Sequence, residues 1–228
     1  MQNKDKTTQP YYCAPGERIS KEILEKLKQI NETYKKDKDF PKYMEAIKNL
    51  FKLQQINLTN ENKLFFGGFL EGEGSLNMSA KKLKTARFGL IIDPEFSLTQ
   101  HVNGVNHLFV ALSVFQTGRI RFKTGSNATL VFMIDNRLAL EEKVIPFYES
   151  YVNPFCLSQS PTKLKRFQDF KELLRLFKEG GHKDLNLFCN KILPLWSAAR
   201  MQKGQVNETF SSLEEAQDFV RNQTTSAS

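Results

Sequence analysis

The sequence predicts an α+β protein: a four-stranded, mainly antiparallel sheet with helices on one face, preceded by an N-terminal helical extension. Apolar residues recur at helical spacing in the first fifty residues, alternate with polar residues in four short central segments, and return to helical spacing in the C-terminal part. We expect three regions: a disordered tip with the helical extension (1–58), the main domain (59–205), and a C-terminal tail with a short helix (206–228).

The N-terminal region combines polar residues with helix-breaking ones. Residues 1–16 contain Pro10, Pro15 and Gly16, so we expect this tip to be disordered. Helices are expected over 20–38 and 41–53, with Ser20 as the N-cap of the first and Pro41 in the first turn of the second. This unit is too small to form a domain of its own, so it either packs on the main domain or reaches a partner.

The main domain is expected to begin with a helix over 60–70, capped by Thr59. Strands follow over 75–81 and 87–99, and Pro94 marks an edge or a bend in the second. A helix over 103–116 precedes strands over 119–123 and 128–134, which a turn at 124–127 joins. The remaining helices are expected over 137–151, 161–179, 183–202 with a kink at Pro194, and 213–220.

The composition favours a protein that binds a polyanion. The chain has a net charge of +8 and a pI near 9.3, and nucleic acid is the commonest polyanionic partner. No apolar run approaches the roughly 18 residues of a membrane span, and the polar N-terminus lacks a secretory signal, so we expect an intracellular protein that is not secreted. The cysteines and histidines have no metal-ligand spacing, so carboxylates must hold any metal, which favours a hard ion such as Mg2+.

The polar residues of the four strands share one face, because apolar side chains fall at the even positions. A solvated outer face is the simplest interpretation. However, lysine and arginine outnumber acidic residues between 75 and 135, which favours nucleic-acid contact. We predict that nucleic acid binds this face and its flanking loops through Asn77, Ser79, Lys81, Lys82, Lys84, Arg87, Ser97, Arg119, Arg121, Lys123, Ser126, Asn127 and Thr129.

Glycines at the end of the 60–70 helix indicate a close helix contact. Gly67 and Gly68 each cost the helix about 1 kcal/mol relative to alanine. A helix that frays into a loop explains Gly72 but not these two. Gly68 and Gly72 share one face and would let two copies of the helix approach, bringing Glu71 or Glu73 of each copy together. Facing carboxylates persist when divalent cations lie between them, as phosphodiester hydrolysis requires.

The segment 66–74, Phe-Gly-Gly-Phe-Leu-Glu-Gly-Glu-Gly, resembles the signature of the LAGLIDADG homing endonucleases, with glutamate at both acidic positions. It occurs once, as in the homodimeric subclass with an αββαββα core. The chain from about Pro15 to Asn222 is similar to the branch encoded in group I introns of chloroplast large-subunit ribosomal RNA genes. That similarity is carried by Asp93–Phe96, Thr99–Gly104, Thr117–Arg121 and Gly125–Leu130.

The resemblance implies a homing endonuclease for intron mobility that cuts double-stranded DNA at a long, pseudo-palindromic site, with Mg2+ or alternatively Mn2+ and no small-molecule cofactor. It implies metal binding by Glu73 and the Gly72 carbonyl, catalytic roles for Gln100, Lys163 and Lys165, and a chloroplast or other organelle as location. Some relatives carry an arginine at the position of Gly104. The homodimer interface would comprise Phe65, Gly67, Gly68, Phe69 and Gly72.

Two other functions fit a basic protein of this fold: an RNA-binding intron maturase without cleavage activity, and a non-catalytic DNA-binding regulator. The paired acids Glu71 and Glu73 argue against both, because neither role needs them. Two roles are also open for the N-terminal helices, which either contact flanking DNA or brace the fold.

Overall fold

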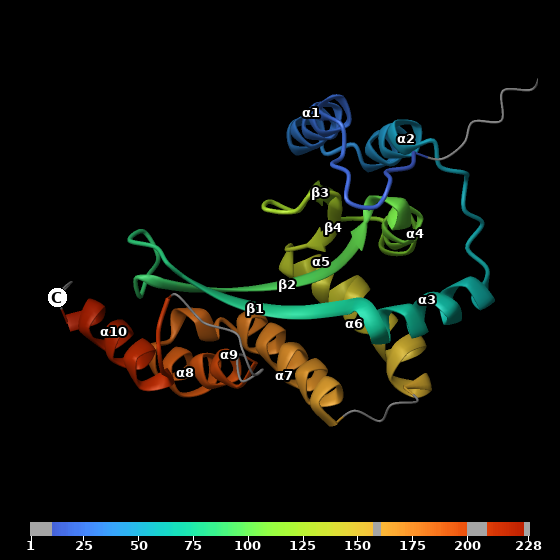
Figure 1. Ribbon diagram of the computed structural model, residues 1–228. Helices are drawn as coiled ribbons and strands as arrows, with labels where there is room; N and C mark the ends of the chain where they lie inside the picture. The colour runs from blue at the N-terminus through green and yellow to red at the C-terminus, as the bar shows by residue number, and fades with distance from the viewer. Residues whose placement is uncertain (1–10, 157–160, 200–208, 226–228) are drawn as a thin grey trace, which may run out of the picture. The chain divides into compact units, whose positions relative to one another are not determined.

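The computed structural model describes residues 11–156, 161–199 and 209–225 (Figure 1). The chain forms two compact units. The first comprises Met1–Gly74 and Ser97–Ile134, and the second comprises Ser75–Phe96 and Asp135–Ser228. The domain boundaries at 58 and 205 stay a prediction. Within the described residues, no helix is long and apolar enough to cross a membrane.

The four strands form one sheet, which confirms the predicted architecture. β1 (Gly74–Lys82), β2 (Leu90–His101), β3 (Arg119–Phe122) and β4 (Thr129–Ile134) are arranged in the order β1-β2-β4-β3. β3 and β4 run antiparallel, with Ile120 opposite Phe132. Pro94 does not mark an edge strand, because β2 lies inside the sheet and continues through this buried residue. Proline has no backbone N–H, so β2 donates no hydrogen bond from this position.

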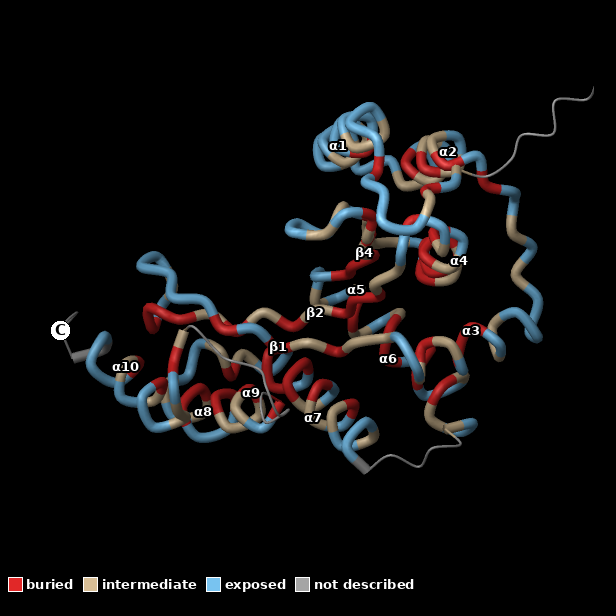
Figure 2. Tube along the Cα trace, viewed as in Figure 1, coloured by how far each residue is buried: buried red, intermediate tan, exposed pale blue. Residues whose placement is uncertain are grey.

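The first unit contains four α-helices: α1 (Lys21–Asp37), α2 (Phe40–Phe51), α3 (Asn60–Glu73) and α4 (Val105–Phe115). The N-cap at Ser20 is confirmed, since its side chain accepts a hydrogen bond from the Ile23 amide. The short 3-10 helix η1 (Val102–Gly104) leads into α4, which is buried on most of its sides (Figure 2). The stacked rings of Phe115 and Phe132, 6.1 Å apart, pack α4 on β4. The apolar sequence of α4 therefore forms the core of this unit.

The expected disorder of residues 1–16 is wrong for its second part. Cys13 is buried, and its amide donates to Asn103 Oδ1 at 2.9 Å, while Asn103 Nδ2 donates to the Cys13 carbonyl at 2.9 Å. The Tyr11 amide also donates to the Phe51 carbonyl at 3.2 Å. Asn103, which is distant in sequence, thus provides hydrogen-bond partners for the backbone of Cys13. Local composition does not reveal such a contact. Residues 1–10 lie outside the described residues.

The second unit is mostly helical. A continuous helical segment over residues 137–152 alternates α and π turns: α5 (Arg137–Ala139), η2 (Leu140–Val144), α6 (Ile145–Phe147) and η3 (Tyr148–Val152). The other elements are η4 (Asn153–Phe155), α7 (Pro161–Lys178), η5 (Gly181–Lys183), α8 (Leu185–Leu187), η6 (Phe188–Ile192), α9 (Leu193–Ala199) and α10 (Leu213–Thr225). The π turn η6 ends at Ile192, two residues before Pro194, the residue at which a kink was predicted. The predicted end of that helix at 202 lies outside the described residues.

The core of the second unit joins β2, η3 and α7 through aromatic rings. The Phe96 and Tyr148 rings meet edge to face at 6.0 Å, and Tyr148 stacks on Phe167 at 5.7 Å. Burial of the Tyr148 hydroxyl raises its pKa. This packing holds α7 against the strands and places the first turns of α7 in a defined position.

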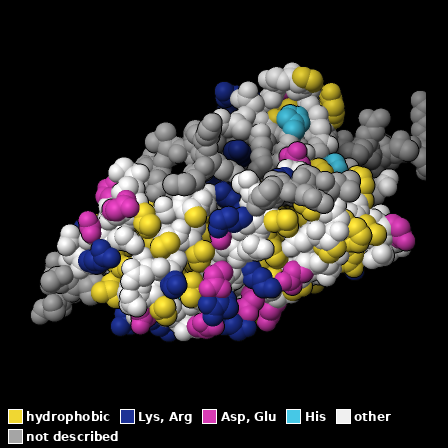
Figure 3. Space-filling view, turned by 90° about the horizontal axis from the view of Figure 1, so that it is seen from below, with side chains coloured by type: hydrophobic (Ala, Val, Ile, Leu, Met, Phe, Trp, Pro, Cys, Tyr) yellow, Lys and Arg dark blue, Asp and Glu magenta, His cyan; other side chains and the backbone are white. Residues whose placement is uncertain are grey.

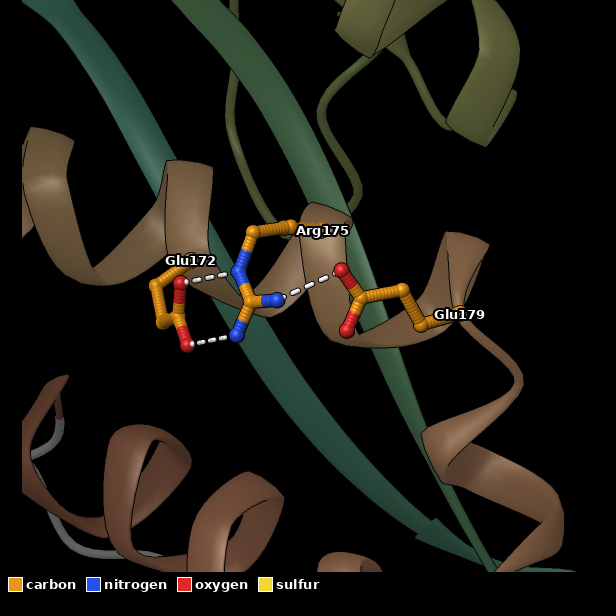
Figure 4. A network of polar contacts seen from close by, with 3 residues as sticks. All are labelled: Glu172, Arg175 and Glu179. Carbon is orange, nitrogen blue, oxygen red and sulfur yellow. Dashed lines mark hydrogen bonds and ion pairs between the residues drawn. The ribbon is translucent and has the colours of Figure 1, made fainter.

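The outer surface of the second unit carries paired charges. Arg175 lies between Glu172 and Glu179 (Figure 4): Nε and Nη2 each lie 2.7 Å from a Glu172 oxygen, and Nη1 lies 2.5 Å from Glu179 Oε1. The hydrogen bonds with Arg175 lower the pKa of Glu172. Basic and acidic side chains are intermixed on the face shown in Figure 3. Such a surface has little excess charge to attract a polyanion.

Candidate active site and nucleic-acid interface

The helix α3 ends one turn later than predicted, at Glu73 rather than at residue 70. It begins with a capping box in which Thr59 and Asn62 exchange side-chain and backbone hydrogen bonds, both at 3.3 Å. It continues because the Gly74 amide still donates to the Leu70 carbonyl. Glu73 is therefore an exposed carboxylate on the last residue of the helix, where the negative end of the helix dipole disfavours an unpaired anion.

One face of α3 has room beside its glycines. Phe65 is 73% exposed. A Cβ atom added at Gly68 or at Gly72 would meet no heavy atom within 4 Å. The spacing 65, 68 and 72 places these three residues on one side of the helix. We call Phe65, Gly68 and Gly72 the open face of α3, because Phe65 is exposed and a side chain at either glycine would have room within the chain.

The inner face of α3 packs on α4. Phe66 and Leu70 are buried, and the Phe66 ring meets Phe115 edge to face at 6.3 Å. Gly67, which was predicted to lie in the homodimer interface, is buried beside Phe66 on the inner side of the helix, and its place in that interface stays a prediction. Phe69 is partly buried and stacks on the ring of His107 at 4.4 Å.

Gln100, the predicted catalytic glutamine, lies near the end of β2 in the same unit as Glu73. Its side chain covers Gly104, since a Cβ there would lie 2.9 Å from Gln100 Oε1. His107 Nδ1 lies 3.3 Å from the Gly104 carbonyl. The contacts from Gln100 through Gly104 and His107 to Phe69 connect the end of β2 to α3. Sequence reasoning missed His107, because stacking on a residue 38 positions earlier leaves no local signal.

The predicted lysines lie on α7, in the second unit. Lys163 and Lys165 are exposed, and Lys165 Nζ lies 2.8 Å from an oxygen of Asp169. Arg166 is partly buried and donates to the carbonyls of Leu76, at 3.2 Å, and Ala199. Arg166 therefore ties α7 to β1 and α9. Both lysines lie in the first turns of α7 and are exposed to solvent.

The polar strand face is exposed along β1, with two exceptions to the predicted set. Lys82 lies at an even position, with its Nζ 4.4 Å from the centre of the Phe210 ring, so it faces the C-terminal segment instead of the polar face. Ser97 is only 8% exposed, because the expected alternation fails where residues 96–98 are all buried. Lys81 keeps its predicted exposure and pairs with Asp93 Oδ2 at 2.9 Å. Exposed or partly exposed members of this set are Asn77, Ser79, Lys84 and Arg87.

The β3–β4 hairpin carries the remaining predicted contacts, Arg119, Arg121, Lys123, Ser126, Asn127 and Thr129, all exposed or partly exposed. The Ser126 hydroxyl donates to the Lys123 carbonyl at 2.7 Å and shapes the turn. Asn127 Oδ1 accepts a hydrogen bond from Arg18 Nε at 3.1 Å. Sequence reasoning missed Arg18, which adds an exposed cation beside this turn.

Within the described residues, no group of three histidine, cysteine, aspartate or glutamate side chains could hold a metal ion. One copy of the chain thus offers the exposed Glu73 carboxylate without a complete set of protein ligands.

Several known proteins are similar to this chain in sequence and in architecture. The model of the family described as LAGLIDADG endonuclease matches residues 66–174. DNA endonuclease I-CeuI of Chlamydomonas moewusii is 58% identical over 212 residues, which cover 93% of this chain and 96% of that protein. The solved structure of the group I intron-encoded homing endonuclease I-CeuI complexed with DNA superposes with a TM-score of 0.88 at 56% identity, covering 92% of this chain and 100% of that one. The archaeal endonuclease I-Vdi141I shares the fold, with a TM-score of 0.62 at 23% identity over 73% of this chain and 98% of that one. This chain belongs to the LAGLIDADG endonuclease family.

Proposed function

We propose that this protein is a homodimeric, divalent-metal-dependent homing endonuclease that cuts both strands of a long, pseudo-palindromic DNA site. The open face of α3 carries this proposal. A Cβ atom at either of its glycines would have room within the chain, so side-chain crowding does not explain them, and Phe65 leaves apolar surface in solvent. A second copy of α3 packed on this face would bring two Glu73 carboxylates together at the ends of the paired helices.

The metal site is proposed to be completed by dimerisation. The Glu73 carboxylate and the Gly72 carbonyl are hard oxygen donors, which suit Mg2+ and also Mn2+. A second copy would double these donors, and DNA phosphates would add further oxygens. When bound, such an ion neutralises charge on the phosphate and lowers the pKa of attacking water. Two facing carboxylates without a cation would repel each other, so the dimer itself favours cation binding.

The other predicted residues act around that centre in this proposal. The Gln100 amide would hold a water molecule or a phosphate oxygen by hydrogen bonds. The exposed ammonium groups of Lys163 and Lys165 would stabilise the negative charge that develops on the phosphate. The contact of Gln100 with Gly104 supports this role, because it gives the glutamine side chain a defined position.

The strand face is proposed to bind DNA in the major groove. Its cations would contact phosphates, while arginine, asparagine and serine side chains would read base edges. Each copy would read one half-site, so a two-fold dimer implies a pseudo-palindromic target. The relative I-CeuI supports this assignment, since its structure was solved as a group I intron-encoded homing endonuclease with DNA. On the same basis we propose that the protein promotes the mobility of a group I intron and that it is located in a chloroplast or another organelle.

A cleavage assay with a splicing control tests the proposal. The substrate is a plasmid with an intron-free large-subunit ribosomal RNA gene. We expect linear product with Mg2+ and none with a chelator. An uncut plasmid, together with faster splicing of the host intron by the same protein, would overturn the enzyme assignment in favour of a maturase.

A further inference from the structure

β3 is the edge strand of the sheet and pairs with β4 on one side only. The outward N–H and C=O groups of such a strand need other partners. The Ile120 amide donates to the Tyr43 hydroxyl at 2.7 Å, and the Ile120 carbonyl accepts from Asn31 Nδ2 at 2.9 Å. Tyr43 is 2% exposed, so its bond to Ile120 is shielded from water. Helices α1 and α2 therefore satisfy both outward backbone groups of this residue.

A second contact fixes the turn of the same hairpin. The Ile19 amide donates to the Asn127 carbonyl at 3.1 Å, and Arg18 donates to the Asn127 side chain. The Val102 amide donates to the Ala128 carbonyl at 2.7 Å from the other side. The segment that leads into α1 thus holds the turn, while Asn31 and Tyr43 hold the strand.

The two residues that flank Ile120 are the predicted DNA contacts Arg119 and Arg121. Their side chains alternate with Ile120, whose side chain is fully buried, so their direction depends on the twist and position of β3. A strand of 4 residues with one strand neighbour has few bonds of its own to set that position. Partners on its outer edge therefore control where both guanidinium groups lie.

We propose that Asn31 and Tyr43 are positioning residues for DNA recognition: they hold β3 so that Arg119 and Arg121 meet their base pairs. The inference rests on the proposed DNA-binding function and assigns a role to the N-terminal helices. These helices act on specificity through the backbone of Ile120. The hydrogen bonds of Asn31 and Tyr43 support this role, because both end on Ile120, the residue between the two arginines.

Tyr43→Phe tests the proposal, because it removes the hydroxyl that accepts from the Ile120 amide and that also donates to Asn31 Oδ1 at 3.4 Å. Tyr12→Phe, at a tyrosine that is 69% exposed, is the matched control. The first readout is hydrogen exchange of the Ile120 amide without DNA. We expect a protected amide in the wild type and in Tyr12→Phe, and about tenfold faster exchange in Tyr43→Phe, as for loss of one buried hydrogen bond.

The second readout is discrimination between the target and sites altered at single base pairs. Arg121→Ala first identifies the base pairs that β3 reads. At those positions we expect Tyr43→Phe to lower discrimination about tenfold, with other positions unchanged. Asn31→Ala removes the side chain that donates to the Ile120 carbonyl, so it should lower discrimination at the same base pairs. This variant replaces Tyr43→Phe if Tyr43→Phe does not fold.

An equal loss of affinity at every position, with discrimination intact, would overturn the proposal and leave a purely structural role. An unprotected Ile120 amide in the wild type would also overturn it. Failure of the wild type to bind or cut DNA would instead overturn the proposed function, and the exchange data distinguish these cases.

Discussion

Replacement of Gly68 by alanine should stabilise the single chain and weaken the dimer. An added Cβ at this exposed helical position meets no heavy atom within 4 Å, so alanine causes no clash inside the chain. Alanine in place of glycine in a helix contributes about 0.5–1 kcal/mol. For a chain of 228 residues this corresponds to a rise of roughly 1–4 °C in the unfolding midpoint.

The same methyl group should oppose close packing of two α3 helices. Overpacking a tight contact costs about 1–3 kcal/mol, and two-fold symmetry places the change in the interface twice. Even about 1 kcal/mol for each copy amounts to about 2 kcal/mol, or roughly a thirty-fold higher Kd of the dimer. The two effects therefore have opposite signs, which separates a helix-contact role from a general loss of stability.

Sedimentation measures the dimer Kd, and chemical unfolding at a protein concentration below that Kd measures the stability of the single chain. Glu25→Ala, at an exposed position of α1, is the control and should change neither quantity appreciably. A Gly68→Ala protein that dimerises with the wild-type Kd would refute the reasoning. A destabilised single chain would refute it too, because alanine would then clash within the chain.

Three further predictions concern the DNA interface and the second unit. DNA affinity should fall steeply with salt, with a slope of log K against log salt steeper than about −4; a shallow slope in filter-binding titrations would contradict the basic strand face. Arg166→Ala should lower the free energy of unfolding by about 2 kcal/mol in denaturant titrations, since two backbone carbonyls lose a charged donor; unchanged stability would show that these bonds are dispensable. Lys163→Ala and Lys165→Ala should fold normally yet cut DNA more slowly at unchanged affinity, and wild-type rates in single-turnover assays would remove both lysines from the active site.

Regular elements were predictable where apolar periodicity is long and strong. The helices near 20–38, 103–116 and 161–179 and all four strands occur close to their predicted positions. The order of the strands in the sheet is harder to predict from the sequence, because pairing joins segments that are distant in the chain. The path of β2 through Pro94 shows this limit: whether a missing amide matters depends on what pairs with that residue, which the local sequence does not reveal.

The candidate site was predictable in its helix and less so in its surroundings. Two glycines four residues apart indicate a close contact, and the structure shows that their own chain leaves that face open. Strand alternation failed for Ser97, which is buried, and it does not reveal the contact of the exposed Lys82 with Phe210. The roles of His107 and Tyr43 arise from contacts across 38 and 77 positions, which no local pattern encodes.

The central claim is that Glu73 provides the carboxylate for metal-dependent cleavage. The most direct measurement compares single-turnover cleavage of target DNA by the wild type and by Glu73→Gln with Mg2+, with binding measured on the same DNA. The account predicts that glutamine, which keeps the size and removes the charge, lowers the cleavage rate by roughly a thousand-fold and leaves binding intact. Cleavage by Glu73→Gln at the wild-type rate would contradict the account.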